Sequence, residues 1–342
     1  MTTLTRRRLL GGIGAVAGVA GLTGLGLPAR AAASKVNVGA LRLVSHAPSF
    51  IAQERGYFAE AGLDVEFSFF QAAQPMAVAI ASGDVGFGAT AITGGLISLA
   101  QKGVAKVIGG ALREEKGIPG QVILASNAAY EAGLTRPEAL AGHSYGVTTA
   151  GSSFHYMGSR VARAAGVNPE ELRFRPLQKV GAVIGALKSG QVDAWSIVPN
   201  IADGLVQAGA AKQIGLIADY IPDYQVTTLM CSAANAADER EKTAAFIAAF
   251  ARGAADFNAA LVDRSAGDAD EIVAMIHKYV YEDDAPEVAA RKIAAGAMRL
   301  SPGCALDMGS VEDQLDWFRA EGLVKDAVTT EMLVDPSYVD AA

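Results

Sequence analysis

Short apolar strands alternate with helical segments along most of this chain. From Lys35 the pattern gives a first strand, a helix over about 49–61, a strand at 63–67 and a helix at 73–82. Strands separated by helices of ten to fifteen residues form right-handed βαβ units, because the helix packs back onto the sheet. The alternation therefore predicts an α/β fold with mostly parallel sheets flanked by helices.

The alternation restarts in the middle of the chain. A strand at 144–148 and a helix at 154–165 open a second series of the same kind. The two series share a corner, since Ser82-Gly83-Asp84-Val85 and Ser189-Gly190-Gln191-Val192 each end a helix and open a strand. Because this corner recurs at the matching place in both series, we expect two equivalent lobes.

The end of the chain is almost purely helical, beginning with a long alanine-rich helix at 239–262. Helices that follow two α/β lobes predict a chain that crosses back to the first lobe. We expect crossings near 117–122 and 223–229, which together make a hinge beside a ligand cleft. The expected division is a first lobe of residues 34–118 and 230–342 and a second lobe of residues 119–229.

Residues 1–33 have the layout of a cleaved export signal. Arg6-Arg7-Arg8-Leu9-Leu10 is a basic head, a glycine-rich apolar run follows to Leu27, and Ala31–Ala33 offers a small-residue cleavage site. The paired arginines resemble a Tat-type signal, which predicts a periplasmic protein cleaved near Ala31–Ala33. The alternative is a membrane anchor, because the apolar run approaches spanning length.

Composition excludes several classes of function. The formal net charge of −7 makes nucleic acid and anionic membranes poor partners. The four histidines and two cysteines have no metal-ligand spacing, so we expect no metal and no cofactor. Cys231 and Cys304 could pair in an oxidising compartment or stay buried as free thiols. We expect a monomer.

The most specific motif lies in residues 44–66, which include Ala-x-x-x-Gly-Tyr-Phe-x-x-x-Gly-Leu-Asp-Val-Glu. Further matches follow at 79–88, 140–147 and 186–194. These residues are similar to the nitrate/sulfonate/taurine substrate-binding proteins of ABC transporters, a group that includes the NMT1/THI5-like binding proteins for thiamine-precursor pyrimidines. The resemblance implies the two-lobed periplasmic binding protein type II fold, a small-molecule ligand in the cleft and an inner-membrane ABC permease as partner.

Candidate ligand-binding residues follow the strands, because open α/β sheets bind ligands beyond the carboxyl ends of their strands. The loop 148–153 precedes a helix whose first amides could hold an anion, although its serines could equally be mere helix caps. His46 is either a ligand contact or a turn cap, Trp195 a stacking wall or core, and Arg113 an anion partner or a surface residue. The nominated residues are Ser45, His46, Phe50, Gln71, Gly88, Ala89, Thr90, Arg113, Thr149, Gly151, Ser152, Ser153, His155, Trp195, Pro199 and Asn200.

The leading hypothesis is an exported solute-binding protein that closes over a small organic anion, a sulfonate or carboxylate, and delivers it to an ABC permease. Donors at two helix starts favour an anion, while the lack of a clear arginine pair leaves a neutral or pyrimidine-like ligand open. A sensing role is not separable from transport by sequence. THI5-like pyrimidine synthases share the fold but carry a C-C-C-F-C segment, and hydrolases of the G-x-S-x-G type carry that motif. This chain has neither, so we expect no enzyme.

Overall fold

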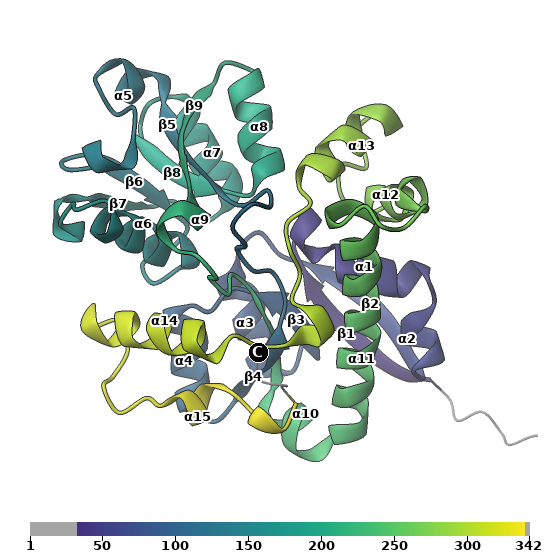
Figure 1. The fold of residues 1–342 in the computed structure, drawn as a ribbon. Helices are drawn as coiled ribbons and strands as arrows, with labels where there is room; N and C mark the ends of the chain where they lie inside the picture. Colours follow the sequence, from purple (N-terminus) through teal and green to yellow (C-terminus); the bar gives the residue numbers. More distant parts are fainter. Residues whose placement is uncertain (1–32, 339–342) are drawn as a thin grey trace, which may run out of the picture. The chain divides into compact units, whose positions relative to one another are not determined.

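The first of two five-stranded sheets combines the start of the described chain with one strand from much later in the sequence (Figure 1). This computed structural model describes residues 33–338, and the chain from Ala33 onward forms one compact unit. The strand order is β2-β1-β3-β10-β4, and β10 runs antiparallel to both of its neighbours. The strands are β1 (Ser34–Ala40), β2 (Leu63–Phe69), β3 (Phe87–Thr90), β4 (Ala105–Gly110) and β10 (Thr228–Ser232).

The second sheet repeats this arrangement in the order β7-β6-β8-β5-β9, with β5 as the antiparallel strand. Both antiparallel strands are the first strand after a crossing, so the chain enters each sheet against the direction of its neighbours. The matching orders confirm the α/β fold and its two equivalent, mostly parallel sheets. The strands are β5 (Val122–Ser126), β6 (Ser144–Val147), β7 (Arg173–Pro176), β8 (Ala194–Ile197) and β9 (Ala211–Leu216).

Helices that connect the strands cover each sheet. In the first lobe, α3 packs on β3 and β10, α4 packs on β4, and α1 and α2 pack against α11 (Arg240–Phe257). In the second lobe, α6 and α7 cover β6 and β8, while α8 packs on β9. The connecting helices are α1 (Ala47–Glu54), α2 (Tyr57–Glu60), α3 (Ala73–Ser82), α4 (Gly94–Gln101), α5 (Asn127–Glu131), α6 (Ser153–Ala164), α7 (Val180–Lys188), α8 (Pro199–Gln207) and α9 (Ile217–Tyr220).

The helix expected over 49–61 is two helices, and this prediction was wrong in its continuity. Gly56 has φ of 74° between α1 and α2, a left-handed conformation that ends the first helix. Such a φ suits glycine because a Cβ would meet the carbonyl oxygen. A short 3-10 turn, Val44–His46, also precedes α1. The motif Gly56-Tyr57-Phe58 therefore marks a break in the helix, and it leaves the Phe58 ring buried in the core.

The crossings between the lobes lie side by side, and a third segment braces them. Arg113 of the first crossing forms an antiparallel β-bridge with Gln225 of the second crossing. The neighbouring Leu112 forms an antiparallel β-bridge with Leu300 of the third segment. Residues 299–301 are called the bracing segment here. The sequence predicted the two crossings but not this third segment, because its contacts join residues far apart in the chain.

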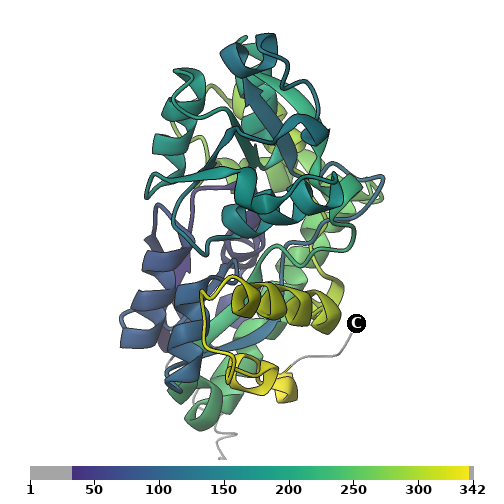
Figure 2. The same cartoon turned by 90° about the vertical axis from the view of Figure 1, so that its left-hand side faces the viewer.

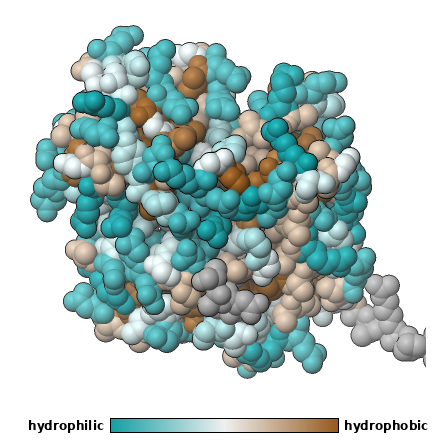
Figure 3. Space-filling view, in the orientation of Figure 1, coloured by the Kyte–Doolittle hydropathy of each residue, from teal (hydrophilic) through white to brown (hydrophobic). Residues whose placement is uncertain are grey.

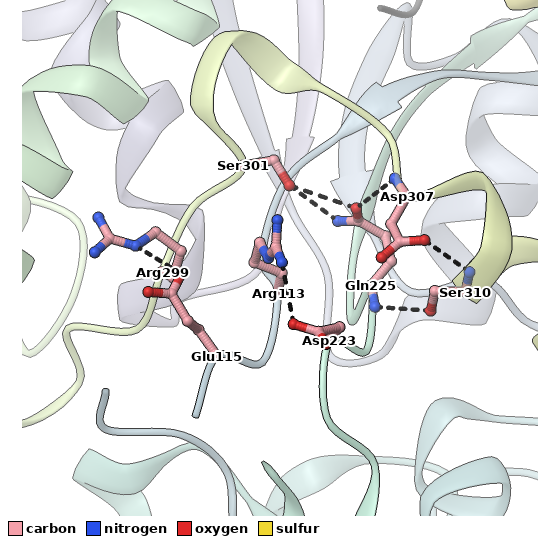
Figure 4. Close-up of polar contacts among 8 residues, drawn as sticks. All are labelled: Arg113, Glu115, Asp223, Gln225, Arg299, Ser301, Asp307 and Ser310. Carbon is pink, nitrogen blue, oxygen red and sulfur yellow. Dashed lines mark hydrogen bonds and ion pairs between the residues drawn. The ribbon is translucent and has the colours of Figure 1, made fainter. Parts of the chain in front are cut away.

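Side chains connect the bracing segment to the crossings (Figure 4). The Gln225 Nε2 atom donates to Ser301 Oγ at 3.4 Å, and Gln225 Oε1 accepts from the Asp307 amide at 3.3 Å. On the other side Arg299 pairs with Glu115 at 3.1 Å. The hinge of this protein is therefore a three-segment structure with its own hydrogen bonds.

The longest of the C-terminal helices is α11, which contributes to the core of the first lobe. Its phenylalanines Phe246, Phe250 and Phe257 are buried. Among the described residues, the stretch Arg240–Val262 is the one helix long and apolar enough to cross a membrane, but half of its apolar window is buried inside the protein, as is usual for a core helix. The C-terminal helices are α10 (Ala233–Asp238), α11 (Arg240–Phe257), α12 (Ala269–His277), α13 (Pro286–Ala295), α14 (Met308–Ala320) and α15 (Thr330–Leu333).

Both cysteines are buried free thiols, Cys231 in β10 and Cys304 just after the bracing segment. Burial raises the pKa of each thiol to about 12, so neither is a reactive thiolate at neutral pH. The sequence left open a disulfide or two buried free thiols, and the structure shows the free thiols. The expected Tat-type signal, residues 1–33, lies almost wholly outside the described residues.

Candidate functional site

A cavity of about 70 Å³ lies between the two sheets, at the carboxyl ends of their strands. Its first-lobe wall comes from the ends of β1, β2 and β3 and the segments after them, and its second-lobe wall from the segments after β6, β7 and β8. Leu112 and Gln121 of the first crossing and Thr227 of the second close the back. Small-molecule sites usually enclose about 300–1,000 Å³, so in this conformation the cavity fits only a small ligand.

The lining carries no formal charge. None of the described residues that line the cavity is an aspartate, glutamate, lysine or arginine. Its titratable member is His46, and burial lowers the pKa of this imidazole to about 4. The ring of the ligand-free protein is therefore neutral at pH 7 and can take part in hydrogen bonds. A ligand in this cavity meets hydroxyls, amides, one neutral imidazole and apolar side chains.

His46 is held in one tautomer by the backbone. Its Nδ1 atom accepts a hydrogen bond from the Leu41 amide at 3.4 Å. A neutral imidazole that accepts at Nδ1 carries its proton at Nε2, so the ring presents a donor. The ring makes no capping bond to the helix it precedes. The ring thus bonds to the backbone of the segment that precedes α1, and its role as a ligand contact stays a prediction.

The loop 148–153 brings the start of α6 to the cavity. Gly151 has φ of 70°, its amide donates to His155 Nδ1 at 3.1 Å, and its carbonyl accepts from the Gly94 amide of the other lobe at 2.9 Å. Ser152 stands at the N-cap but makes no capping bond, and its buried hydroxyl has no partner among the described residues. The Ser153 and Phe154 amides, the first two of this twelve-residue helix, have no acceptor within the helix and have the positive end of the helix dipole behind them, whereas the His155 amide donates to the Ser152 carbonyl at 2.9 Å.

Gln121 links the cavity to a buried carboxyl group in the hinge. Its backbone amide donates to Glu114 Oε1 at 3.1 Å. Burial raises the pKa of Glu114 to about 7, and the nearby Gln121 groups oppose that rise. The Glu114 amide in turn donates to the Tyr224 carbonyl at 2.8 Å, which ties the two crossings together. The back wall of the cavity is thus part of the hinge.

The cavity brings together nominated residues from both lobes. The ones that line it are Ser45, His46, Thr90, Thr149, Ser152 and Ser153. They come from three different loops, as the rule on strand ends expects. Their role as ligand contacts stays a prediction.

Two nominated aromatic residues are core residues. Phe50 is fully buried and its ring stacks on Tyr279 at 4.5 Å. Trp195 is also fully buried, in β8, and its ring centroid lies 5.5 Å from that of Phe154, which lines the cavity. Trp195 thus lies behind the wall and does not form it. In both cases burying a large ring outweighs exposing it to the cleft.

Other nominated residues of the first lobe and the hinge also lie outside the lining. Gly88 and Ala89 are inside β3, and Gln71 is exposed on the surface. Arg113 pairs with Asp223 at 3.4 Å between the two crossings (Figure 4). Because β3 extends to Thr90, Gly88 and Ala89 lie within the sheet and not in the loop after it.

The remaining nominated residues contact C-terminal helices. His155 packs its ring against Phe174 and Trp317. Asn200 donates from Nδ2 to the Tyr281 hydroxyl at 2.5 Å. Pro199 lines a separate hollow of about 380 Å³ between α8 and α13, visible as a depression of the surface in Figure 3. No local pattern signals the contacts with Tyr281 and Trp317, because these residues lie far from Asn200 and His155 in the chain.

Sequence reasoning missed several polar residues of the lining. Gln74 and Thr93 stand at the starts of α3 and α4, and Gln121 and Thr227 stand in the crossings. Thr93 caps α4 by accepting from the Leu96 amide at 3.1 Å and donates to Gln74 Oε1 at 2.9 Å. The rule on strand ends would have found the first two if it had been extended to the following helix starts. Nothing in the sequence marks the other two.

Comparison with known proteins gives one family and a consistent fold. Residues 44–260 match the family described as NMT1/THI5 like. No curated protein sequence matches the chain.

Solved structures with this fold are similar over most of the chain. The alkanesulfonate-binding protein SsuA from Xanthomonas axonopodis pv. citri, bound to MOPS, has a TM-score of 0.68 and 17% identity, covering 90% of this chain and 99% of that one. The periplasmic nitrate-binding protein NrtA from Synechocystis PCC 6803 has a TM-score of 0.68 and 14% identity, covering 87% and 84%. A ligand-binding component of an ABC-type import system from Staphylococcus aureus has a TM-score of 0.70 and 14% identity, covering 90% and 99%.

Proposed function

Since this chain belongs to the NMT1/THI5-like family, we propose that it is a solute-binding protein of an ABC importer. Its two lobes close on a small molecule in the cavity, and the closed form delivers that molecule to a membrane permease. The observation that carries this proposal is the cavity itself, which is enclosed by the strand ends of both sheets and backed by the hinge. The fold is shared with an alkanesulfonate-binding protein and a nitrate-binding protein.

Binding in this cavity needs no covalent chemistry. Its hydroxyls and its neutral imidazole can donate and accept hydrogen bonds, but the described lining holds no acid beside the imidazole to activate a nucleophile. We therefore propose a carrier and not an enzyme of the THI5-like type. We further propose that the paired arginines at the N-terminus send the chain to the periplasm and that it acts as a monomer.

The first candidate ligand is a small organic anion of sulfonate or carboxylate type. Free amides and the dipole at the start of α6 favour an anionic oxygen, and Ser152 adds a hydroxyl with no partner among the described residues. The second candidate is a neutral or pyrimidine-like molecule. It is favoured by the uncharged lining, because a buried anion without a cationic partner pays a large desolvation cost.

A thermal-shift screen of the chain without residues 1–33 tests the function and separates the two ligand classes. The screen uses matched pairs, such as a carboxylate with its amide and a sulfonate with its sulfonamide. A bound ligand raises the melting temperature by mass action, and calorimetry then gives its affinity. We expect one member of a pair to stabilise the chain clearly more than the other. No stabilisation by any pair, or turnover of a compound, would contradict the proposal.

A further inference from the structure

The C-terminal helix α14 makes an extended polar contact with α6 of the second lobe. The Trp317 Nε1 atom donates to Ser159 Oγ at 2.9 Å, and both residues are buried. The Tyr156 hydroxyl donates to Asp313 Oδ2 at 2.6 Å, and Arg160 pairs with the other oxygen of Asp313 at 3.0 Å. Figures 1 and 2 both show α14 running beside the helices of the second lobe.

Both ends of α14 are tied to the hinge and to the first lobe. At its start the Ser310 hydroxyl accepts from the Gln225 amide at 2.9 Å, and Gln314 Nε2 donates to the Gln225 carbonyl at 3.1 Å. Beyond its end, Val334 forms a bridge with Val107 of β4. The helix is therefore attached to the second crossing at its start, to the first lobe through the chain that follows it, and to the second lobe through its side.

Phe318, which follows Trp317 in α14, reaches the loops that close the cavity. A Cβ added at Gly151 would lie 3.4 Å from the Phe318 ring, and one added at Gly94 would lie 3.6 Å from the same ring. Directly between these glycines, the Gly94 amide donates to the Gly151 carbonyl across the two lobes at 2.9 Å. Phe318 thus packs where the start of α4 meets the start of α6.

We propose that α14 is a strap that holds the second lobe closed over the cavity. None of the described residues that line the cavity belongs to α14, so the helix can act on a ligand only through the position of the lobes. Trp317, Asp313 and Phe318 are positioning residues in this proposal. Opening the lobes would expose the buried Trp317 ring and leave its N–H and the Asp313 carboxylate without their present partners. The meaning of the strap for transport rests on the proposed solute-binding function.

Two tyrosine variants test the strap. Tyr156→Phe removes the bond to Asp313 between the lobes. Tyr57→Phe is the matched control, because Tyr57 also donates to an aspartate, Asp256, at 2.6 Å in a part-buried site, but both partners belong to the first lobe. Each variant loses one hydroxyl of the same kind.

The readout is the distance between the lobes, measured with spin labels on Val78→Cys in α3 and Val206→Cys in α8. Both positions are exposed, whereas Cys231 and Cys304 are buried and would not be labelled. Without ligand, we expect Tyr156→Phe to add a population at longer distance and Tyr57→Phe to keep the parent distribution. Ser159→Ala, which removes the acceptor of Trp317, should act like Tyr156→Phe.

The strap is wrong if Tyr156→Phe and Ser159→Ala keep the parent distribution, even when both lower the melting temperature, because α14 would then only stabilise the fold. It is equally wrong if the control shifts the distance as much. These measurements use no ligand, so their outcome is independent of whether the screen finds one.

Discussion

At the scale of single residues, the cavity depends on neutral donors and on how the backbone orients them. The Leu41 amide sets the tautomer of His46, and Gly151 turns the chain so that α6 begins at the cavity. Ser152 differs from an ordinary N-cap residue, because its hydroxyl makes no bond to the helix. A buried hydroxyl left without a partner costs free energy in the folded chain, and a ligand that bonds to it would recover that cost.

Ser152→Ala combined with Ser153→Ala should weaken ligand binding roughly tenfold or more, the loss expected for one or two hydrogen bonds. Stability should hardly change, because the Ser152 hydroxyl has no partner to lose. Calorimetry with the best ligand of the screen measures the affinity, and urea unfolding measures the stability. Ser189→Ala, in the same lobe but away from the cavity, is the control. Unchanged affinity would refute the role of the loop.

Glu114 should make stability depend on pH. Its pKa is about 7 in the folded chain against an ordinary value of 4.5, so between these pH values the folded chain holds a proton that the unfolded chain has released. The contribution of Glu114 to the free energy of unfolding is therefore fully present below about pH 4.5 and is lost as the pH rises through 7. Glu114→Gln stays neutral, so from pH 5 to pH 8 it should gain roughly 2–3 kcal/mol in unfolding free energy relative to the parent chain.

Urea unfolding of both chains at pH 5 and pH 8 measures this difference. His46 has the opposite sign, because its pKa of about 4 makes the folded chain lose stability as pH falls below 6.5, but it is present in both chains and cancels. Glu312→Gln, at an exposed position of α14, is the control. An equal pH dependence for Glu114→Gln and the parent would show that Glu114 is ionised as usual.

At the scale of elements, the bracing segment is the feature that a pattern of strands and helices does not contain. The bracing segment is hydrogen-bonded to Asn258, which lies in the π-helical turn Asn258–Val262 after α11. Its Nδ2 atom donates to the Leu300 carbonyl at 2.8 Å, and its Oδ1 atom accepts from the Leu300 amide at 3.1 Å. A helix irregularity thus provides two buried hydrogen bonds to the hinge.

Asn258→Ala should lower the free energy of unfolding by roughly 1–3 kcal/mol, because it leaves both backbone groups of Leu300 buried without these partners. Asn127→Ala is a suitable comparison. Its Nδ2 atom bonds to the Gly209 carbonyl at an exposed site, and its loss should cost roughly 0.5 kcal/mol or less. Chemical denaturation of the three chains measures both effects. Similar small losses for both variants would mean that the Asn258 contacts do not stabilise the hinge.

At the scale of the whole molecule, two sheets of the same strand order are joined by a hinge and held by C-terminal helices on both sides. The α14 helix contacts α6, and α13 contacts α8, where Asn200 bonds to Tyr281. The expected division assigned residues 230–342 to the first lobe. The described part of this region also contacts the second lobe. The C-terminal helices therefore connect the two lobes as well as packing on the first one.

Export is the property of the whole chain that residues 1–33 are expected to determine. Replacing Arg6, Arg7 and Arg8 by lysine keeps the charge but removes the paired arginines that resemble a Tat signal. We expect the variant to stay in the cytoplasm uncleaved while the parent chain reaches the periplasm. Cell fractionation and the mass of the purified chain measure this. Normal export of the lysine variant would contradict the Tat assignment.

Local sequence patterns were enough to predict the α/β class, the repeated series of strands and helices, the family and the loops that meet at the cavity. These follow from local patterns, because hydrophobic period, glycine at helix ends and strand-end loops are properties of neighbouring residues. The loop 148–153 and His46 were found in this way.

Long-range packing determines which side chains of those loops face the cavity and which polar groups the crossings add to it. Trp195 lies behind the cavity wall and Arg113 pairs with Asp223, while Gln121 and Thr227 form the back wall. The bracing segment and the α14 contacts likewise join residues that are far apart in the chain. Such contacts depend on how whole elements pack, and packing is decided by the burial of the complete core and not by any local pattern.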